Sequence, residues 1–276
     1  MLPFPKIGPE IIKIGPISVR WYGVMYLAGF VASYFLIARQ RRAQELGLRG
    51  GPLQDLIIYL AMGLIIGARL GYILFYQFPN FEIYVHNPFE IAAIWHGGMS
   101  FHGGLIGTML AGLLFCRRRS LPYWKVGDTV IVTAPVGLFL GRLGNFVNGE
   151  LFGRPSSLPW AMVFPNGGSV PRHPSQLYEA VLEGVVLFLI LWQLKDRGFR
   201  SGSMVCLFLG GYGILRFFAE FFREPDPQLG FVLGVFTMGQ VFCTLMIIAA
   251  IILWLLLPKS AGPKIYNSNG KGGTNG

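Results

Sequence analysis

The sequence predicts an all-α polytopic membrane protein with about seven transmembrane helices and a small extracytoplasmic head region. Its 276 residues are 53% hydrophobic and only 13% charged, whereas a soluble domain carries roughly 25% charged residues. The mean hydropathy of +0.53 and the 38 Gly and 23 Phe residues are typical of closely packed membrane helices. The lipid bilayer is therefore the first partner that we expect.

Seven apolar runs approach the length of about 20 residues that crosses a bilayer. We expect the spans at about 21–38, 55–77, 98–116, 126–144, 176–194, 202–222 and 235–257, with external loops at about 78–97 and 145–175. Residues 1–257 are expected to form a single transmembrane domain. The Gly/Asn-rich residues 258–276 are expected to be a cytoplasmic tail without ordered structure.

The net charge of +10 does not point to nucleic acid, because the basic residues gather at the ends of the apolar runs. Fourteen Lys and Arg residues lie in the segments 39–54, 117–125, 195–201 and 258–276, and about seven lie on the opposite side. Basic residues concentrate in the cytoplasmic loops of membrane proteins. The N-terminus is therefore expected outside the cytoplasm and the C-terminus inside it.

Cysteine and metal chemistry are not expected. Cys116, Cys206 and Cys243 lie far apart, in or at the ends of apolar runs and without a CxxC spacing, so we interpret them as small apolar core residues. No His, Cys or carboxylate spacing suggests a metal site, and we expect no cofactor. Residues 1–20 also lack the basic start and apolar core of a cleavable signal peptide.

Three arginines lie within or at the end of the predicted spans: Arg69, Arg142 and Arg216. A charge at membrane depth costs roughly 2.5–3.5 kcal/mol or more, so such a residue usually faces a cavity and has a partner. Arg142 also opens the polar stretch "GRLGNFVNGELFGRP", which contains Asn145 and Glu150. This stretch is either a solvated loop or a site.

Carboxylates and a phenol accompany the arginines at helical spacing. Tyr212, Arg216 and Glu220 follow one another at intervals of four residues, so they share one face of a helix. Glu179 and Glu183 repeat this interval on the fifth span. The structural alternative is that these carboxylates simply pair with the arginines and hold the helices together.

A histidine also stands out, in "WHGGMSFHGGLIG" at residues 95–107. Gly103 and Gly107 form a face of small residues that lets a second helix approach closely. Packing explains these glycines, but it does not explain His102. His102 is either a hydrogen-bonded spacer or a functional titratable group near the outer interface.

The predicted helix directions bring the polar groups to one depth. His102 and Tyr22 open spans that run inward, whereas Arg142 and Asn145 end a span that runs outward, and Arg216 lies in the outer half of another. All five therefore lie toward the outer leaflet. The planar forks of two arginines at headgroup depth suit the oxygens of a phosphate.

The polar stretch at 141–155 resembles the signature of the prolipoprotein diacylglyceryl transferase family. The resemblance extends to "RWYGVMY" at 20–26, "GGMSFHGGLIG" at 97–107, "RHPSQLYE" at 172–179 and "GYGILRFFAEFFREPD" at 211–226. These blocks, in this order and with these gaps, cover nearly the whole chain from residue 16 to 257. A short GRxGN alone would be a weak signal, but the set is highly specific.

The resemblance implies an enzyme of the bacterial cytoplasmic (inner) membrane that performs the first step of lipoprotein maturation. The family transfers the diacylglyceryl group of phosphatidylglycerol to the thiol of the lipobox cysteine in a prolipoprotein signal peptide, and releases glycerol phosphate. No cofactor or metal is implied. The residues carried over by motif are His102, Arg142 and Arg216 as catalytic groups, Tyr22, Asn145, Gly153 and Tyr212 as further substrate-binding groups, and Glu150 and Glu220 as supports.

The residue types fit this chemistry. A thiol must lose its proton to attack carbon, and His102 is a candidate base, although it is equally a candidate headgroup ligand. Arg142 and Arg216 are suited to stabilise the charge that grows on the departing phosphate. The rival hypotheses are a transporter for an anionic solute, which would favour an inverted repeat, and a non-catalytic lipid-binding protein.

Overall fold

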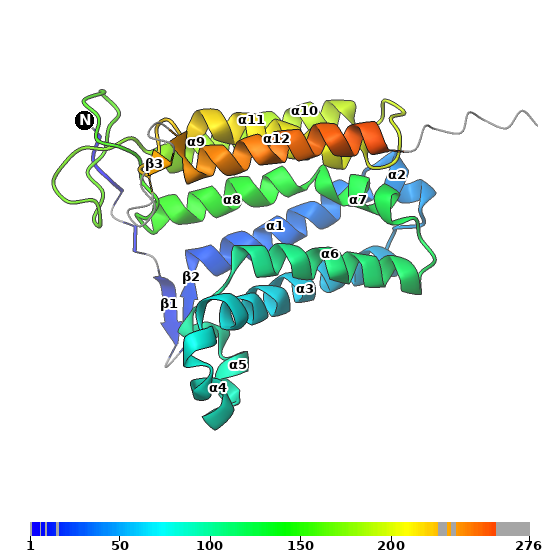
Figure 1. Cartoon of the computed structure of the whole chain (residues 1–276), viewed down its shortest axis with the longest axis horizontal. Helices are drawn as coiled ribbons and strands as arrows, with labels where there is room; N and C mark the ends of the chain where they lie inside the picture. The colour runs from blue at the N-terminus through cyan, green and yellow to red at the C-terminus, as the bar shows by residue number, and fades with distance from the viewer. Residues whose placement is uncertain are drawn as a thin grey trace, which may run out of the picture.

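The computed structural model describes residues 2–5, 7–8, 10–14, 17–225, 231–232 and 236–257, and most of these are helical. Long helices lie side by side along the longest axis of the molecule (Figure 1). They are α1 (Trp21–Ala38), α3 (Gly51–Tyr76), α6 (Phe101–Arg118), α7 (Tyr123–Ile131), α8 (Ala134–Val147), α9 (Ser175–Glu179) continuing through the π-helix η3 (Ala180–Val186) into α10 (Leu187–Leu194), α11 (Ser203–Ala219) and α12 (Met238–Leu256).

A helix occupies each of the seven predicted runs. By length and apolar composition, the described residues contain four helices that can cross a membrane: α1, α3, the continuous helix Ser175–Leu194, and α12. The pair α7 and α8 adds a fifth if it is one span. Helix α11 has only 17 residues, and α6 contains several glycines and ends in arginines. The fold is thus a mostly helical, polytopic membrane protein.

The break between α7 and α8 has a local cause. The two helices meet at an angle of 43°, across Val132 and Thr133. Pro135 follows in the first turn of α8, and a proline lacks the N–H that would continue the hydrogen bonds of α7. The Thr133 hydroxyl donates instead to the carbonyl of Val130 at 2.8 Å. The predicted fourth span is therefore bent.

Glycines set the contact between α3 and α6. A Cβ atom added to Gly107 would lie 2.1 Å from the carbonyl oxygen of Gly63, and one added to Gly67 would lie 2.4 Å from that of Gly103. The two backbones therefore touch, and only glycine fits at these positions. The structure confirms the predicted close approach at Gly103 and Gly107 and identifies α3 as the partner.

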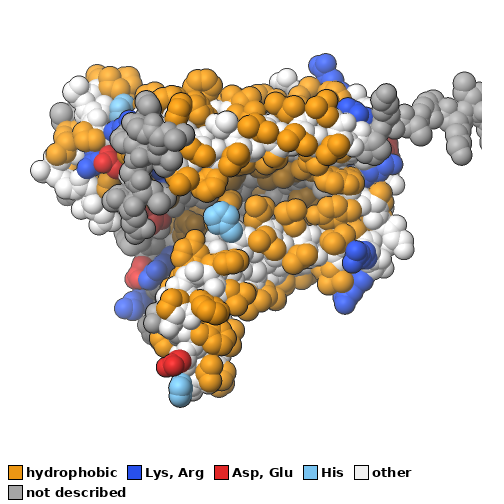
Figure 2. All heavy atoms as spheres, viewed as in Figure 1, with side chains coloured by type: hydrophobic (Ala, Val, Ile, Leu, Met, Phe, Trp, Pro, Cys, Tyr) orange, Lys and Arg blue, Asp and Glu red, His pale blue; other side chains and the backbone are white. Residues whose placement is uncertain are grey.

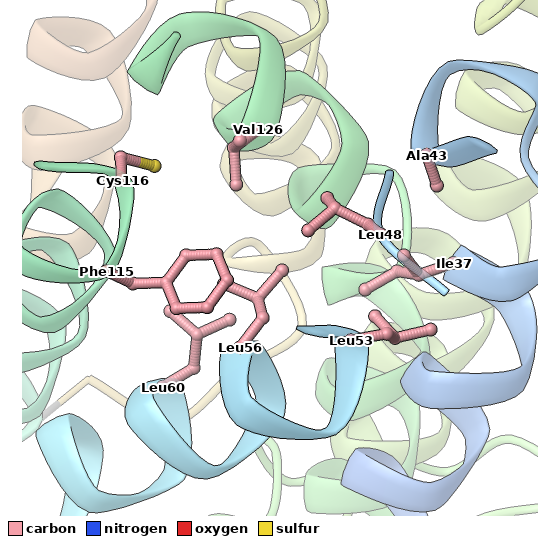
Figure 3. Packing of buried hydrophobic residues seen from close by; sticks show 9 residues of the cluster. All are labelled: Ile37, Ala43, Leu48, Leu53, Leu56, Leu60, Phe115, Cys116 and Val126. Atoms are coloured by element: carbon pink, nitrogen blue, oxygen red, sulfur yellow. The ribbon is translucent and has the colours of Figure 1, made fainter. Parts of the chain in front are cut away.

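One end of the helices, the basic end, carries the turns 39–50, 119–122 and 195–202. Lys and Arg side chains gather there in Figure 2, at the right of the view. Beneath them lies a cluster of buried apolar residues (Figure 3): Ile37, Ala43, Leu48, Leu53, Leu56, Leu60, Phe115, Cys116 and Val126. This cluster joins α1, α2 (Arg41–Glu45), α3, α6 and α7.

A buried carboxylate fixes the start of α11 at the same end. Asp128 on α7 accepts hydrogen bonds from the backbone N–H groups of Gly202 at 2.8 Å, Met204 at 3.0 Å and Val205 at 3.2 Å. It also forms an ion pair with Arg42 Nη1 at 3.2 Å. The N-terminal N–H groups of a helix have no partner within the helix, so a carboxylate there stabilises it. The sequence analysis did not single out Asp128.

The opposite end, the head end, carries the described residues of the N-terminal segment (2–5, 7–8, 10–14 and 17–20) and the segments 77–100 and 148–174. The last segment folds through isolated bridges, of which Gly153 with Arg223 and Met162 with Arg172 are two. Short helices project beside the helix bundle in Figure 1: η1 (Phe78–Asn80), α4 (Glu82–His86), α5 (Phe89–Ala92) and η2 (Ile94–His96).

The all-α prediction misses four short strands at this end. Strands β1 (Glu10–Ile14) and β2 (Ile17–Arg20) form an antiparallel hairpin, and β3 (Phe231–Val232) pairs with β4 (Phe236–Thr237). The strand-forming runs of two to five residues are too short to show a clear alternating pattern in the sequence. The predicted tail 258–276 lies outside the described residues.

Candidate active site

A buried cluster of charges lies near the head end. It connects α8 and α11 with the continuous helix Ser175–Leu194 (α9, η3 and α10), which is called the fifth helix below because it occupies the fifth predicted span. Glu179, at the end of α9, is completely buried. Its carboxylate lies 2.7 Å from Arg142 Nε and 2.8 Å from Arg216 Nη1. One carboxylate therefore bridges the two arginines that the sequence analysis singled out, which come from helices far apart in the chain.

Further carboxylates complete this cluster. Glu183 lies 3.3 Å from Arg142 Nη2 and 3.7 Å from Arg216 Nε, and Glu220 lies 2.6 Å from Arg216 Nη2. Arg223 also approaches Glu179, at 3.6 Å. The sequence-based alternative that Glu179 and Glu183 are partners of the arginines is confirmed, because both carboxylates pair with Arg142 and Arg216.

The phenol of Tyr212 belongs to the same neighbourhood. It lies one turn before Arg216 on α11 and within electrostatic range of Arg142 and Glu183. Its ring stacks on that of Phe208 at a centroid distance of 5.9 Å. The predicted face of Tyr212, Arg216 and Glu220 therefore points at the charge cluster.

The backbone around the cluster is unusual in two ways. Glu183 lies in the π-helix η3, and π-helical turns are rare and occur frequently at functional sites. The next residue, Gly184, packs directly on α8, since a Cβ atom there would lie 2.5 Å from Phe139 Cβ. This close approach lets Arg142, one turn after Phe139, reach both carboxylates of the fifth helix.

A second polar group lies beside the cluster at the end of α8. Asn145 donates to Glu150 Oε1 at 2.9 Å, and Asn148 donates to the same oxygen at 3.3 Å. Gln176 donates to the backbone carbonyl of Glu150 at 2.7 Å. Glu150 thus ties the end of α8 to the start of α9. Gln176 was not among the predicted site residues.

Tyr22 and Gly153 each make a close contact with another segment of the chain. The ring of Tyr22 covers Gly144 on α8, where an added Cβ atom would lie 3.0 Å from Tyr22 Cδ2. Gly153 donates its N–H to the carbonyl of His173 at 2.8 Å. An added Cβ atom at Gly153 would lie 2.4 Å from the carbonyl oxygen of Phe222. Gly153 is therefore needed for the close crossing of three head segments.

His102 lies apart from the charge cluster. It is exposed in the first turn of α6, where it lines a cavity of about 290 Å³ with Phe75, Tyr76 and Ser100. Within the described part of the chain, no hydrogen bond or ion pair joins His102 to Arg142 or Arg216. The structure therefore brings Arg142 and Arg216 together, but it leaves His102 on α6, which packs against α3.

A hollow separates these two parts of the molecule. Figure 2 shows it as a shaded recess between the helices around α12 and α8 and the helices around α6 and α3. In Figure 1, α1 crosses behind this region, and it contacts both α8 and α3. Helix α6, which His102 begins, thus lies on one side of the recess, and α8, which carries Arg142, lies on the other.

Arg69, the third intramembrane arginine, has a different environment. Its guanidinium donates to the backbone carbonyls of Glu90, Ile91 at 3.1 Å, Gly97 at 2.5 Å and Gly98 at 3.1 Å. These partners lie in the loop that leads into α6. Arg69 therefore fixes this loop, and its bonding pattern is structural.

The described residues contain no group of three or more His, Cys, Asp or Glu side chains that could hold a metal ion. Each carboxylate of the charge cluster contacts an arginine instead. The signal for these carboxylates was present in the sequence, as Glu179 and Glu183 one turn apart in an apolar run. Arg223, which follows the end of α11, carried no such signal.

Comparison with known proteins places the chain in a family. The family model described as prolipoprotein diacylglyceryl transferase matches residues 9–256. A phosphatidylglycerol–prolipoprotein diacylglyceryl transferase of Rhodospirillum rubrum is 50% identical over 92% of this chain and 94% of that protein. Proteins of the same name from Geobacter sulfurreducens and Desulfotalea psychrophila are 48% and 46% identical, over 94% and 91% of this chain and 99% and 93% of their own lengths. The chain therefore belongs to the prolipoprotein diacylglyceryl transferase family.

Proposed function

We propose that this chain transfers the diacylglyceryl group of phosphatidylglycerol to the thiol of the lipobox cysteine of prolipoproteins and releases glycerol phosphate. This reaction is the first step of bacterial lipoprotein maturation. The observation that carries the proposal is the pairing of Arg142 and Arg216 at one buried point, in a chain whose full-length relatives carry the name of this activity.

The membrane arrangement that we propose has seven spans, with the N-terminus outside and the C-terminus in the cytoplasm of a bacterial inner membrane. The gathering of Lys and Arg at the basic end supports this orientation, because such residues concentrate on the cytoplasmic side. The head end, with loops 78–97 and 145–175, then faces outward. Residues 1–257 form a single transmembrane catalytic domain in this proposal, followed by the cytoplasmic tail 258–276.

The chemistry is a displacement at a glycerol carbon. The lipobox thiol loses its proton, a sulfur–carbon bond forms, and the carbon–oxygen bond to the phosphate breaks, so that the phosphate oxygen carries the electron pair away. Arg142 and Arg216 stabilise this developing charge. Their buried carboxylate partners hold the two guanidinium forks in fixed positions, which spares their reorganisation during the reaction.

His102 is proposed either as the base that takes the thiol proton or as a ligand of the lipid headgroup. Its exposed position at the start of α6, beside a cavity of about 290 Å³, supports contact with a substrate in either role. As a base it would need to lie within hydrogen-bond reach of the thiol in the bound complex, and catalytic contacts are often longer in an unliganded structure.

The remaining residues act around these groups. Tyr22, Asn145 and Tyr212 are proposed to orient headgroup oxygens or the arginines. Gly153 is proposed to contribute to substrate binding because the absence of a side chain lets the segments of His173 and Phe222 pack against it. Glu150 and Glu220 support Asn145 and Arg216, to which they are bonded. The proposal requires neither a metal nor another cofactor.

A reconstituted assay tests the proposal. Purified protein is incubated with phosphatidylglycerol and a lipobox peptide, and the peptide is analysed by mass spectrometry for the gain of a diacylglyceryl group. A peptide with Ser in place of the lipobox Cys is the control, and it should gain no mass. An unmodified Cys peptide after incubation with folded protein would overturn the proposal, and uptake of an anionic solute by vesicles would favour a transporter instead.

A further inference from the structure

Among the described residues, the charge cluster holds as many cations as anions before any substrate arrives. Its cations are Arg142, Arg216 and Arg223, and its anions are Glu179, Glu183 and Glu220. A phosphodiester that binds the arginines adds a negative charge to this buried set. An uncompensated charge in a low-dielectric region is costly. Binding therefore favours an arrangement in which one carboxylate gives up its place on the arginines.

The three carboxylates are not held equally. Glu179 makes two short contacts, of 2.7 and 2.8 Å, with Arg142 and Arg216. Glu220 lies 2.6 Å from Arg216 and accepts a hydrogen bond from the Thr237 hydroxyl at 3.0 Å. A carboxylate with short, charge-assisted bonds of this kind is strongly retained.

Glu183 is the weakly held member. Its two contacts, with Arg142 Nη2 and Arg216 Nε, measure 3.3 and 3.7 Å, and both are longer than the closest arginine contacts of Glu179 and Glu220. Because it reaches toward both guanidinium groups, it stands where an oxyanion bridging the two arginines would stand. It also lies in the π-helix η3, whose wider turn differs from the α-helical geometry on either side.

We infer that Glu183 is a positioning residue that holds the place of the substrate phosphate between Arg142 and Arg216 and is displaced when the lipid binds. This inference rests on the proposed function. Glu179 stays bound throughout and keeps the two arginines together. Glu183 prevents the arginines from taking other anions or separating in the empty site, and the lipid phosphate competes with it for the same nitrogen atoms.

The matched variants Glu183→Gln and Glu179→Gln test this division of roles. Glu183→Gln removes the competing charge, so it should bind phosphatidylglycerol about tenfold more tightly and show a lower KM, since the competent state no longer has to be formed. Glu179→Gln should bind the lipid more weakly and lose activity. Binding is measured in detergent with phosphatidylglycerol and, for comparison, with diacylglycerol of the same chain length, which lacks the phosphate.

The smaller change Glu183→Asp keeps the test valid should Glu183→Gln fail to fold. It retains the charge but withdraws it by one methylene group, so it should also tighten phosphatidylglycerol binding, by less than Glu183→Gln. Unchanged or weaker binding in whichever of these folded variants is obtained would overturn the inference. An unmodified lipobox peptide in the transfer assay with folded wild-type protein would instead overturn the proposed function, so the two failures are distinguishable.

Discussion

Two helix contacts in this molecule are made in opposite ways. Helices α3 and α6 touch through glycine backbones, with Gly107 against Gly63 and Gly103 against Gly67. The contact of α8 with the fifth helix and α11 is held by ion pairs around Glu179, supported by the single glycine contact of Gly184. Lipid tails supply no hydrophobic drive for helix association, so close packing and polar bonds do this work.

The glycine contact between α3 and α6 forms a structural frame, whereas the ion-pair contact around Glu179 forms a reactive centre. A glycine contact has no chemistry to offer a substrate, and in α3 and α6 it fixes the helix that carries His102 and the loop held by Arg69. An ion-pair contact contains groups that a charged substrate can address. The arginines differ in the same way: within the described residues, the hydrogen bonds of Arg69 go to loop carbonyls, whereas Arg142 and Arg216 bond to carboxylates.

The largest effects are expected on the ion-pair side. Arg142→Ala or Arg216→Ala should reduce transfer by about 10²–10³-fold or more, since a preorganised partner of the leaving phosphate is lost. Lysine at either position should rescue poorly, because a point charge lacks the bidentate fork. The rate of diacylglyceryl gain on a lipobox peptide measures the effect.

Loss of folding is the competing explanation for the arginine variants. Removing Arg142 leaves buried carboxylates without their partner, which typically costs about 3–5 kcal/mol. The double variant Arg142→Ala with Glu183→Gln relieves part of this cost and should unfold at a higher temperature than Arg142→Ala while remaining inactive. Near wild-type transfer by folded Arg142→Lys would show that charge neutralisation alone suffices.

On the glycine side, His102 is expected to matter most. If it is the base, His102→Gln should slow the chemical step by roughly 10²–10⁴-fold while phosphatidylglycerol still binds. The loss should shrink as the pH approaches the pKa of the substrate thiol, because the thiolate then forms without help. The nearby His96→Gln is the control, since His96 is exposed and paired with Glu90 at 3.0 Å, and it should leave the rate unchanged. A loss that is constant with pH would assign His102 to headgroup positioning.

A smaller effect on catalysis is expected from the glycine contact itself. Gly107→Ala places a Cβ atom 2.1 Å from the carbonyl oxygen of Gly63, so the helices must separate, at a cost of about 1–3 kcal/mol in unfolding free energy. Gly137→Ala on α8 meets no atom within 4 Å and serves as the control. Thermal unfolding should separate the two variants more clearly than transfer rates do. Lost transfer without lost stability in Gly107→Ala would contradict the division into frame and reactive centre.

Local patterns in the sequence carried much of this architecture. The apolar runs predicted the helix positions, and the spacing of Gly103 and Gly107 predicted a close helix contact. The regular spacing of Tyr212, Arg216 and Glu220 predicted a shared face. These features are encoded within one or two helical turns, so they are visible without knowing what lies opposite.

Features that depend on distant segments were not predictable in the same way. Asp128 caps a helix that begins 75 residues later, at Ser203, and the choice of loop carbonyls as partners of Arg69 depends on the fold of residues 90–98. The sequence left open whether the arginines pair with Glu220 or with Glu179 and Glu183. The arrangement of α8 and α11 against the fifth helix, which is seen in the structure alone, shows that Glu179 and Glu183 each contact both Arg142 and Arg216.

The smallest effect is expected from the cysteines, which bear on both sides of the comparison. Cys116, Cys206 and Cys243 are all buried, and burial away from water disfavours the reactive thiolate. Cys116 ends the helix that His102 begins, and fourteen residues at 1.5 Å each place them about 21 Å apart. The nucleophile should therefore belong to the substrate. Replacing all three cysteines with Ala should leave transfer largely intact, and no diacylglyceryl adduct of the protein should accumulate when phosphatidylglycerol is supplied without peptide. A mass increase on Cys116 under those conditions would replace direct transfer with a two-step mechanism through the enzyme.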